Sequence, residues 1–188
     1  MPSPVHYLVQ QSPQQGPAGL SPAAWFRYGI GLTDAGGGLC SQWNDQSGNG
    51  RHLKQATATN QPAIQTDGSV LFDGVDNFMK CDAFTLNQPE TVYVLGKWVV
   101  WASDARWIDG DGSSTGMFQG ITATPQIRVA TGAGSTAIVS PTVGAYVVLA
   151  GVFNGASSLI QLNSGAPATG DAVDRYAQGL ISTNPIGH

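Results

Sequence analysis

The sequence predicts an all-β chain in which two antiparallel sheets pack face to face behind an extended amino-terminal arm. Short runs of β-branched and aromatic residues alternate with Gly, Asn, Asp and Pro along most of the 188 residues. No apolar pattern with a period of 3.6 continues over the length of a helix. Many short strands joined by glycine-rich turns are typical of a sandwich or a barrel rather than an α/β fold.

The first 23 residues are expected to form the arm. They are rich in proline and glutamine, and their apolar residues gather at positions 5–9, which is too little for a core. We divide the chain into this arm, residues 1–23, and one sandwich domain, residues 24–188. Ordering an arm costs about 1–2 kcal/mol per residue. We favour an arm that packs on a neighbouring subunit through Val5, Tyr7 and Leu8 over a disordered terminus.

Twelve strands are expected after the arm, and two of them stand out. Residues 91–101 and 146–153 are apolar at consecutive positions, so we expect both in the centre of a sheet with both faces covered. The other strands alternate better between polar and apolar residues, as half-buried strands do. The expected strands span residues 24–28, 41–43, 52–55, 69–72, 77–80, 91–101, 106–108, 117–121, 126–130, 136–139, 146–153 and 159–162.

Two neighbouring stretches carry a more specific pattern. The first is SQWNDQSGNGRH, in which Asp45 and Ser47 are expected to hydrogen-bond the backbone of the turn that they open. The glycines that follow permit positive φ angles. The second is VLFDGVDNFM, in which Phe72 is expected to point inward before a turn at Asp73 and Gly74.

These stretches resemble the laminin-G-like domains of bacterial and phage surface proteins, within the concanavalin A-like superfamily. There a W-x-D-x-S-G-N-G-x-H element precedes an F-D-G-x-x-D-x-[FL] element, and VVLAGVFNGASSLIQLNSGAPATG is similar to a later hairpin. The resemblance covers residues 24–170 and implies a two-sheet antiparallel jelly-roll sandwich. Family members usually continue beyond that hairpin. We therefore expect either closure with fewer strands, helped by the arm or a neighbour's edge, or a shortened version of the fold.

The composition limits the classes of partner that we expect. Charged residues are 11% of the chain, the net charge is −4, and no Lys/Arg cluster is present, so nucleic acid is not an expected partner. The longest apolar run, residues 143–153, is about half of the roughly 20 residues that a membrane helix needs. The sequence as written shows no secretory signal. Free thiols at Cys40 and Cys81 are favoured over a disulfide.

Hydrolytic chemistry is not expected. Glycoside hydrolases of the superfamily that this chain resembles place carboxylates on one strand as Glu-x-Asp-x-x-Glu, whereas Glu90 is the only glutamate here. Asp104, Asp109 and Asp111 are close in sequence, but Asp-Gly-Asp-Gly is the composition of a turn, so a loop is favoured over a catalytic pair. His52 is interpreted as a packed strand-edge residue rather than a base.

No cofactor is predicted. Zinc would need closely spaced Cys and His residues, which the chain lacks. Calcium stays open, because laminin-G-like domains often carry it in a rim loop. Asp109 with Asp111, or Asp73 with Asp76, would supply its ligands, and a plain turn is favoured over both.

One group of residues is a candidate contact site for a glycan or a partner. Trp101, Trp107 and Phe118 flank the loops that contain Asp109 and Asp111, and an exposed aromatic ring beside polar groups would suit a sugar. Core packing of each aromatic residue is favoured over this sugar platform.

The sequence therefore indicates a protein without enzymatic activity. The leading hypothesis is a phage virion component, decorating the capsid or associated with the tail, which forms homo-oligomers through its arm and sheet edges. The alternative is a carbohydrate-binding adhesion module that recognises glycans at the extracellular surface. An enzyme is the third possibility.

Overall fold

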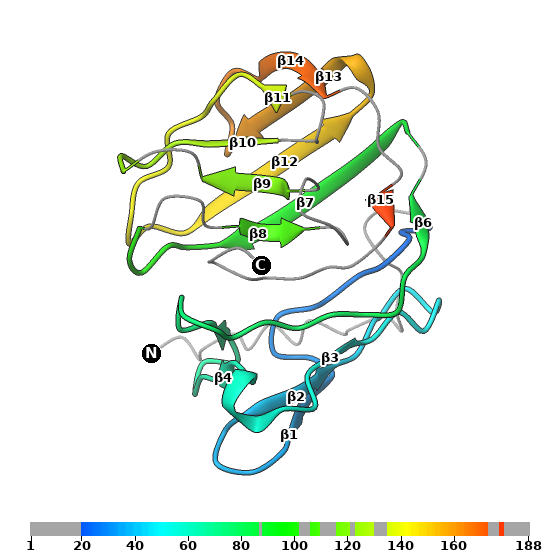
Figure 1. Ribbon diagram of the computed structural model, residues 1–188, viewed down its shortest axis with the longest axis vertical. Coiled ribbons are helices and arrows are strands. Elements are labelled where there is room, and N and C mark those ends of the chain that lie inside the picture. Colours follow the sequence, from blue (N-terminus) through cyan, green and yellow to red (C-terminus); the bar gives the residue numbers. More distant parts are fainter. Residues whose placement is uncertain are drawn as a thin grey trace, which may run out of the picture.

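The computed structural model describes residues 20–86, 88–101, 106–109, 116–120, 123–129, 135–172 and 177–178. The strands in these ranges pair antiparallel, so the chain is all-β as the sequence predicts (Figure 1). A one-turn 3-10 helix spans Ala58–Asn60. No helix of the described part is long and apolar enough to cross a bilayer. The arm residues Val5, Tyr7 and Leu8 lie outside the described ranges.

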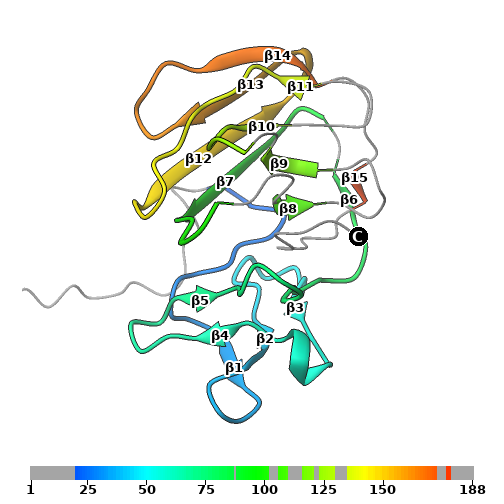
Figure 2. The same ribbon diagram turned by 60° about the vertical axis from the view of Figure 1, so that its left-hand side comes forward.

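Two sheets pack face to face in the upper part of Figure 1, and Figure 2 shows the larger one from a second side. The larger has the order β11-β14-β13-β12-β7, and the smaller has the order β10-β9-β8. Their bounds are β7 (Glu90–Gly96), β8 (Arg106–Asp109), β9 (Gly116–Gly120), β10 (Ile127–Val129), β11 (Ser135–Thr136), β12 (Val147–Phe153), β13 (Gly155–Leu162) and β14 (Ala168–Ala172). Buried side chains of both sheets form one cluster: Ile108, Ile127, Val129, Val147, Leu149, Phe153 and Ile160, with Trp98.

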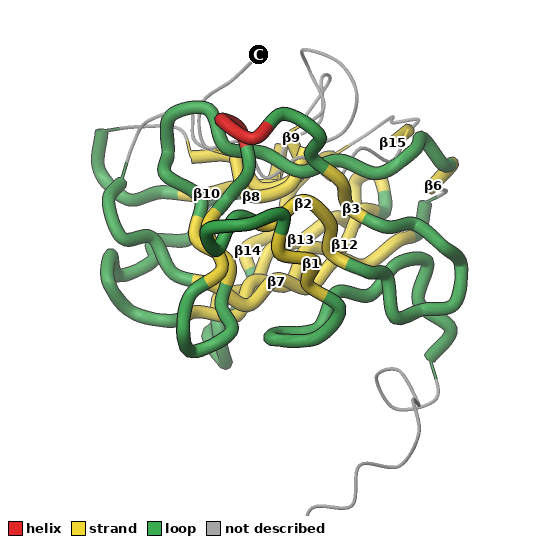
Figure 3. The backbone as a smooth tube through the Cα atoms, turned by 90° about the horizontal axis from the view of Figure 1, so that it is seen from below, coloured by secondary structure: helices red, strands yellow, loops and turns green. Residues whose placement is uncertain are grey.

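A second group of short strands lies below these sheets in Figure 1, and Figure 3 views the molecule from that end. The bounds are β1 (Leu32–Asp34), β2 (Cys40–Trp43), β3 (Leu53–Lys54), β4 (Ala63–Ile64) and β5 (Val70–Leu71). This part has its own buried cluster of Cys40, Leu53, Met79 and Cys81, flanked by aromatic side chains. At the side of the molecule, β6 (Thr85–Leu86) pairs with β15 (Ala177–Gln178).

The first expected strand, residues 24–28, is not a strand. Trp25 donates its backbone N–H to the Asp45 carboxylate, and its carbonyl accepts a hydrogen bond from Gln46. The Arg27 carbonyl accepts the indole N–H of Trp43. Because a loop and two side chains satisfy these backbone groups, no ladder forms here.

The prediction that residues 91–101 and 146–153 are covered on both faces is wrong. β12 does lie between two strands, but β7 is the edge of its sheet. Tyr93 and Leu95 of β7 and Val148 of β12 are exposed. β7 also ends at Gly96, because the chain then turns and the Trp98 carbonyl accepts the Gly144 N–H at 2.7 Å.

Several strands were not anticipated. β4 has only two residues, which is too short for any periodicity, and β14 reads ATGDA, which lacks large β-branched or aromatic residues. β1, β6 and β15 were missed as well. Residues 77–80 form no strand and contribute only an isolated bridge between Lys80 and Lys54. The other expected strands overlap observed ones with shifted ends.

Candidate functional site

An exposed apolar surface lies on the side of the five-stranded sheet that faces away from the three-stranded sheet. Val92 and Val94 of β7 pack against the inner cluster, so the alternate residues of that strand point outward. We call this surface the outer apolar face and define it by four residues: Tyr93, Leu95, Tyr146 and Val148. Leu95 lies directly opposite Val148 in the ladder.

The exposure of this face is large for apolar side chains. Tyr93 is 69% exposed and Leu95 is 65% exposed, and the turn beyond β7 adds Val99 and Val100, the latter at 79%. Single exposed apolar residues are common on any protein, whereas a contiguous group marks a contact surface. The outer apolar face is therefore a candidate contact surface.

The strands of the outer apolar face carry little charge, and beside them Lys97 interacts electrostatically with Asp67. The Nζ atom of Lys97, which directly follows β7, lies 4.8 Å from the ring centroid of Tyr146 in a cation–π contact. β12 contains no charged residue, and the one charged residue of β7 is Glu90. A strongly charged partner would therefore find little electrostatic attraction here.

β7 also presents an open edge. Within the described ranges, its backbone pairs with β12 along the whole strand, and no strand pairs on the other side. Edge strands offer unpaired N–H and C=O groups to another chain. This edge faces the second group of strands, β1–β5 (Figure 1).

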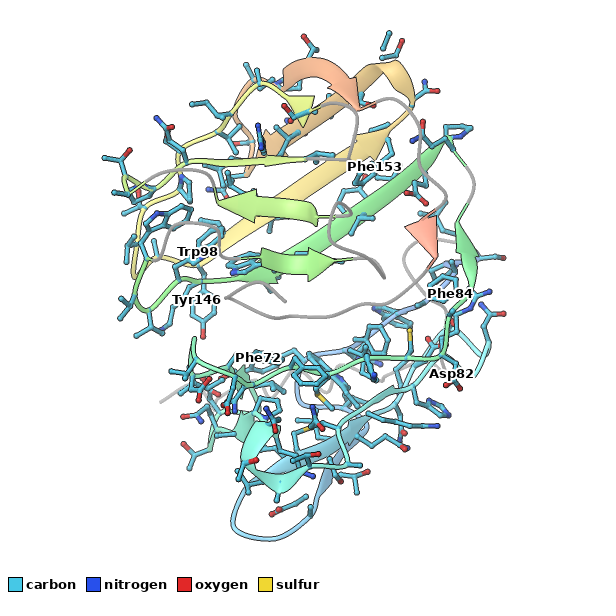
Figure 4. The ribbon with its side chains drawn as sticks, in the orientation of Figure 1. Phe72, Asp82, Phe84, Trp98, Tyr146 and Phe153 are labelled. Atoms are coloured by element: carbon cyan, nitrogen blue, oxygen red, sulfur yellow. The ribbon has the colours of Figure 1, made fainter. Side chains whose placement is uncertain are left out.

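The predicted aromatic site is packed against the inner cluster. Trp107 of β8 stacks on Trp98, with ring centroids 3.8 Å apart and planes at 16°. Trp101 lies 5.2 Å from Trp98 at a tilt of 57°. Trp98 lies at the same end of the sandwich as Tyr146, and Phe153 lies toward the other end (Figure 4). Both Trp101 and Trp107 remain partly exposed.

The predicted acidic partners are only partly described. Asp109 is the last residue of β8, opposite Gly116 of β9, and only its backbone is described. Asp104 and Asp111 lie outside the described ranges. Phe118 belongs to β9 by its backbone, opposite Val129. The prediction for these carboxylates therefore lies outside the described side chains.

The second calcium candidate is a turn. Asp73 accepts hydrogen bonds from the backbone N–H groups of Val75, Asp76 and Asn77 at 2.9, 3.3 and 3.2 Å. Partial burial raises the pKa of Asp73, but these hydrogen bonds outweigh it and leave the pKa below its ordinary value. Among the described residues, no three His, Cys, Asp or Glu side chains gather where they could hold a metal.

The turn chemistry predicted around Asp45 is confirmed. Its carboxylate accepts the backbone N–H groups of Trp25, Ser47 and Arg51 at 2.8–3.0 Å and the Ser47 hydroxyl at 2.7 Å. Burial raises the pKa of Asp45, and the hydrogen bonds outweigh this and lower it. His52 accepts the Asp45 backbone N–H at Nδ1, 3.1 Å away, so it helps to hold the same loop.

Glu90 is a half-buried carboxyl group that the sequence did not mark as special. It begins β7 opposite Phe153, and its Oε2 atom is buried without a hydrogen-bond partner. Burial raises its pKa to about 6. A raised pKa suits a general acid, but such chemistry also needs a second group, and no other carboxylate of the described residues lies beside it in the ladder.

The two cysteines are free and buried in the second cluster. The Cys40 thiol donates to the Gln42 carbonyl at 3.4 Å. Burial raises the pKa of Cys40, which disfavours the reactive thiolate. Cys40 therefore acts as a packing residue.

Sequence reasoning found the loops but missed the outer apolar face. The sequence did contain a signal for this face, because residues 91–101 and 146–153 are apolar at consecutive positions. The same pattern is typical of a strand that is buried on both sides, and it was interpreted in that way. Comparisons with protein-family models, with curated proteins and with solved structures find no match for this chain.

Proposed function

We propose that this chain is a structural protein without enzymatic activity, a laminin-G-like jelly roll that assembles into a phage virion as a capsid-decorating or tail-associated subunit. The observation that carries the proposal is the outer apolar face beside the open edge of β7. Burying apolar surface supplies about 25 cal/mol per Å², so a face of this kind gains stability when another subunit covers it.

Two further observations support an assembly role. The arm carries its own apolar residues, among them Val5, Tyr7 and Leu8, which suit contacts with a neighbour. The second observation is the loop held by Asp45, which contacts the base of the arm. Asn49 donates its side-chain amide to the carbonyls of Pro22 and Ala23 at 3.1 and 3.0 Å. These bonds anchor the base of the arm, so the arm departs from a fixed point.

The alternative, a glycan-binding module, has less support. Trp101 and Trp107 keep some exposure, but one face of Trp107 is occupied by Trp98. A sugar platform needs a free aromatic face with polar groups around it. Binding on a glycan array by the full chain, lost in Trp101→Ala, would support this alternative.

The assembly of the full chain tests the proposal. Sedimentation velocity over a concentration series should show a defined oligomer, and removal of residues 1–19 should weaken it. That deletion keeps Pro22 and Ala23, so the anchored base of the arm is retained. A full-length chain that stays monomeric at about 100 µM, a concentration typical of weak association, would contradict the proposal.

A further inference from the structure

We propose that the amino-terminal arm folds back over the five-stranded sheet of its own chain, so that residues 5–9 lie along the outer apolar face. The inference rests on the proposed function for the role of the arm, and it names the surface on which the arm lies. The arm and the sheet then form together the surface that a neighbouring subunit contacts. The occupant of the face is a segment of the same chain.

The outer apolar face continues as a strip without charged residues across the sheet. Tyr93 of β7 lies opposite Ala150 of β12, and Val152 of β12 lies opposite Leu159 of β13, all on the outward side. The strip begins at the row of Leu95, four positions from the row of Val152. Because a strand rises about 3.4 Å per residue, the strip is about 14 Å long.

The arm has the length and the chemistry that this strip requires. Residues 1–19 contain no Asp, Glu, Lys or Arg, and their apolar side chains gather at positions 5–9. These five residues span about 13 Å when extended, which matches the strip. Pro2 and Pro4 precede them, and proline-rich segments form a polyproline II helix that binds aromatic surfaces at a low entropic cost. Tyr93 supplies an exposed ring.

The arm also starts on the side of the molecule that carries the face. The described chain begins at Leu20, and in Figure 3 it begins on the side of β7, opposite β8 and β9. The bonds from Asn49 to Pro22 and Ala23 fix this point. The eleven residues from Val9 to Leu20 span about 34 Å as polyproline II. A domain of about 165 residues has a radius of gyration of about 15 Å, so the arm reaches the face.

The covalent connection favours the arm over a separate partner. A free partner loses translational and rotational freedom when it binds. A segment on a short linker binds instead at an effective concentration of about a millimolar. Alternate residues of an extended chain point to opposite sides. Val5, Tyr7 and Val9 therefore face the sheet, whereas Leu8 points outward and contacts the neighbour.

Thiol accessibility tests the docking. Leu95→Cys should react with a thiol reagent such as DTNB at least about fivefold faster after deletion of residues 1–19, because the reaction follows the population of the uncovered state. Cys40 and Cys81 are buried, and the unsubstituted chain gives their baseline. Circular dichroism verifies that each variant is folded.

Val75→Cys is the matched control. Val75 is 68% exposed and lies in the Asp73 turn, away from the outer apolar face. Its reaction rate should be the same with and without the arm. Tyr7→Ala in the full chain should speed the reaction of Leu95→Cys toward the rate of the deletion, because it removes the largest apolar contact of the arm.

A disulfide identifies the chain whose arm lies on the face. Leu95 and Thr91 lie at opposite ends of the strip, so Val5→Cys should crosslink with Leu95→Cys or with Thr91→Cys, according to the direction of the arm. Oxidation at about 1 µM should give a product of monomer size, because weakly associating chains are then separate. A mixture of the single-cysteine chains should give no crosslinked dimer.

The outcomes separate this inference from the proposed function. Equal rates for Leu95→Cys with and without the arm, or no crosslink at either end of the strip, would overturn the docking. Crosslinked dimers from the mixed chains would also overturn it and retain the assembly function, with the arm on the neighbour's face. A chain that stays monomeric at about 100 µM but keeps the protection of Leu95→Cys would contradict the assembly function and retain the docking.

Discussion

The indole of Trp107 lies nearly parallel to that of Trp98, with ring centroids 3.8 Å apart. Trp107 belongs to β8 in the three-stranded sheet, and Trp98 lies two residues after the end of β7 in the five-stranded sheet. The stack therefore joins the two layers at one end of the sandwich. Gly96 makes room for it, because an added Cβ there would lie 3.0 Å from the Cη2 atom of Trp107.

Gly96→Ala should therefore destabilise the fold. The added methyl group displaces Trp107 from its stack, and such overpacking costs about 1–3 kcal/mol, which exceeds the 0.5–1 kcal/mol that alanine gains over glycine within a strand. Urea unfolding followed by tryptophan fluorescence measures the loss. In a Trp107→Leu background the same substitution should cost much less, and equal costs in both backgrounds would contradict the assigned clash.

Glu90 should make the stability fall as the pH rises. Its pKa is raised to about 6 by burial, so the unfolded chain ionises at lower pH than the folded chain does. The free energy of unfolding should thus decrease between about pH 4.5 and 6 and then stay level. The group is only half-buried, so solvent screening limits the effect to about 1 kcal/mol.

Glu90→Gln should remove this pH dependence and stabilise the protein by about 1 kcal/mol at pH 8. Urea unfolding from pH 4 to 8 of both proteins gives the difference directly. Parallel curves for the wild type and the variant would show that Glu90 is not the titrating group.

Asp45→Asn should destabilise the loop that anchors the base of the arm. The carboxylate accepts hydrogen bonds from three backbone N–H groups and one hydroxyl. In asparagine an NH2 group replaces one of the two carboxylate oxygens, so some of these donors would lose their acceptor. Leaving such groups unsatisfied costs about 1–3 kcal/mol. Because the folded pKa of Asp45 is lowered, the wild type loses this advantage as the pH falls below about 4. Thermal unfolding at pH 7 and pH 3 checks both statements.

Ser158→Ala should weaken the turn between β12 and β13. The buried hydroxyl accepts the Asn154 N–H at 2.9 Å and donates to the Gly155 carbonyl at 2.7 Å. Its removal should cost about 1–2 kcal/mol in the free energy of unfolding. The neighbouring Ser157→Ala, at an exposed position, is the matched control and should be nearly neutral. Similar losses for both serines would contradict this role.

Turn chemistry was predictable from the sequence because it acts over a few residues. Within their loop, Asp45 and Ser47 accept hydrogen bonds from N–H groups at most six positions away, and Gly48 and Gly50 have φ angles of 89° and 72°. The bond from the Trp25 N–H to Asp45 spans 20 positions and was not predicted. The aromatic site was less predictable. The sequence favoured a packed Trp107, and this side chain stacks on Trp98. Trp98 itself was expected on a strand that continues to residue 101. The chain turns after Gly96 instead, and the hydrogen bond there comes from the distant Gly144.

The sequence by itself determined the all-β class and the local turns, since strand period, glycine placement and short side-chain hydrogen bonds are properties of neighbouring residues. Only the tertiary structure decided that β7 is an edge and that Tyr93 and Leu95 face outward. The physical reason is that burial of a strand face depends on segments far away along the chain. An exposed apolar strand face has the same residue pattern as one that is covered by other segments of the chain.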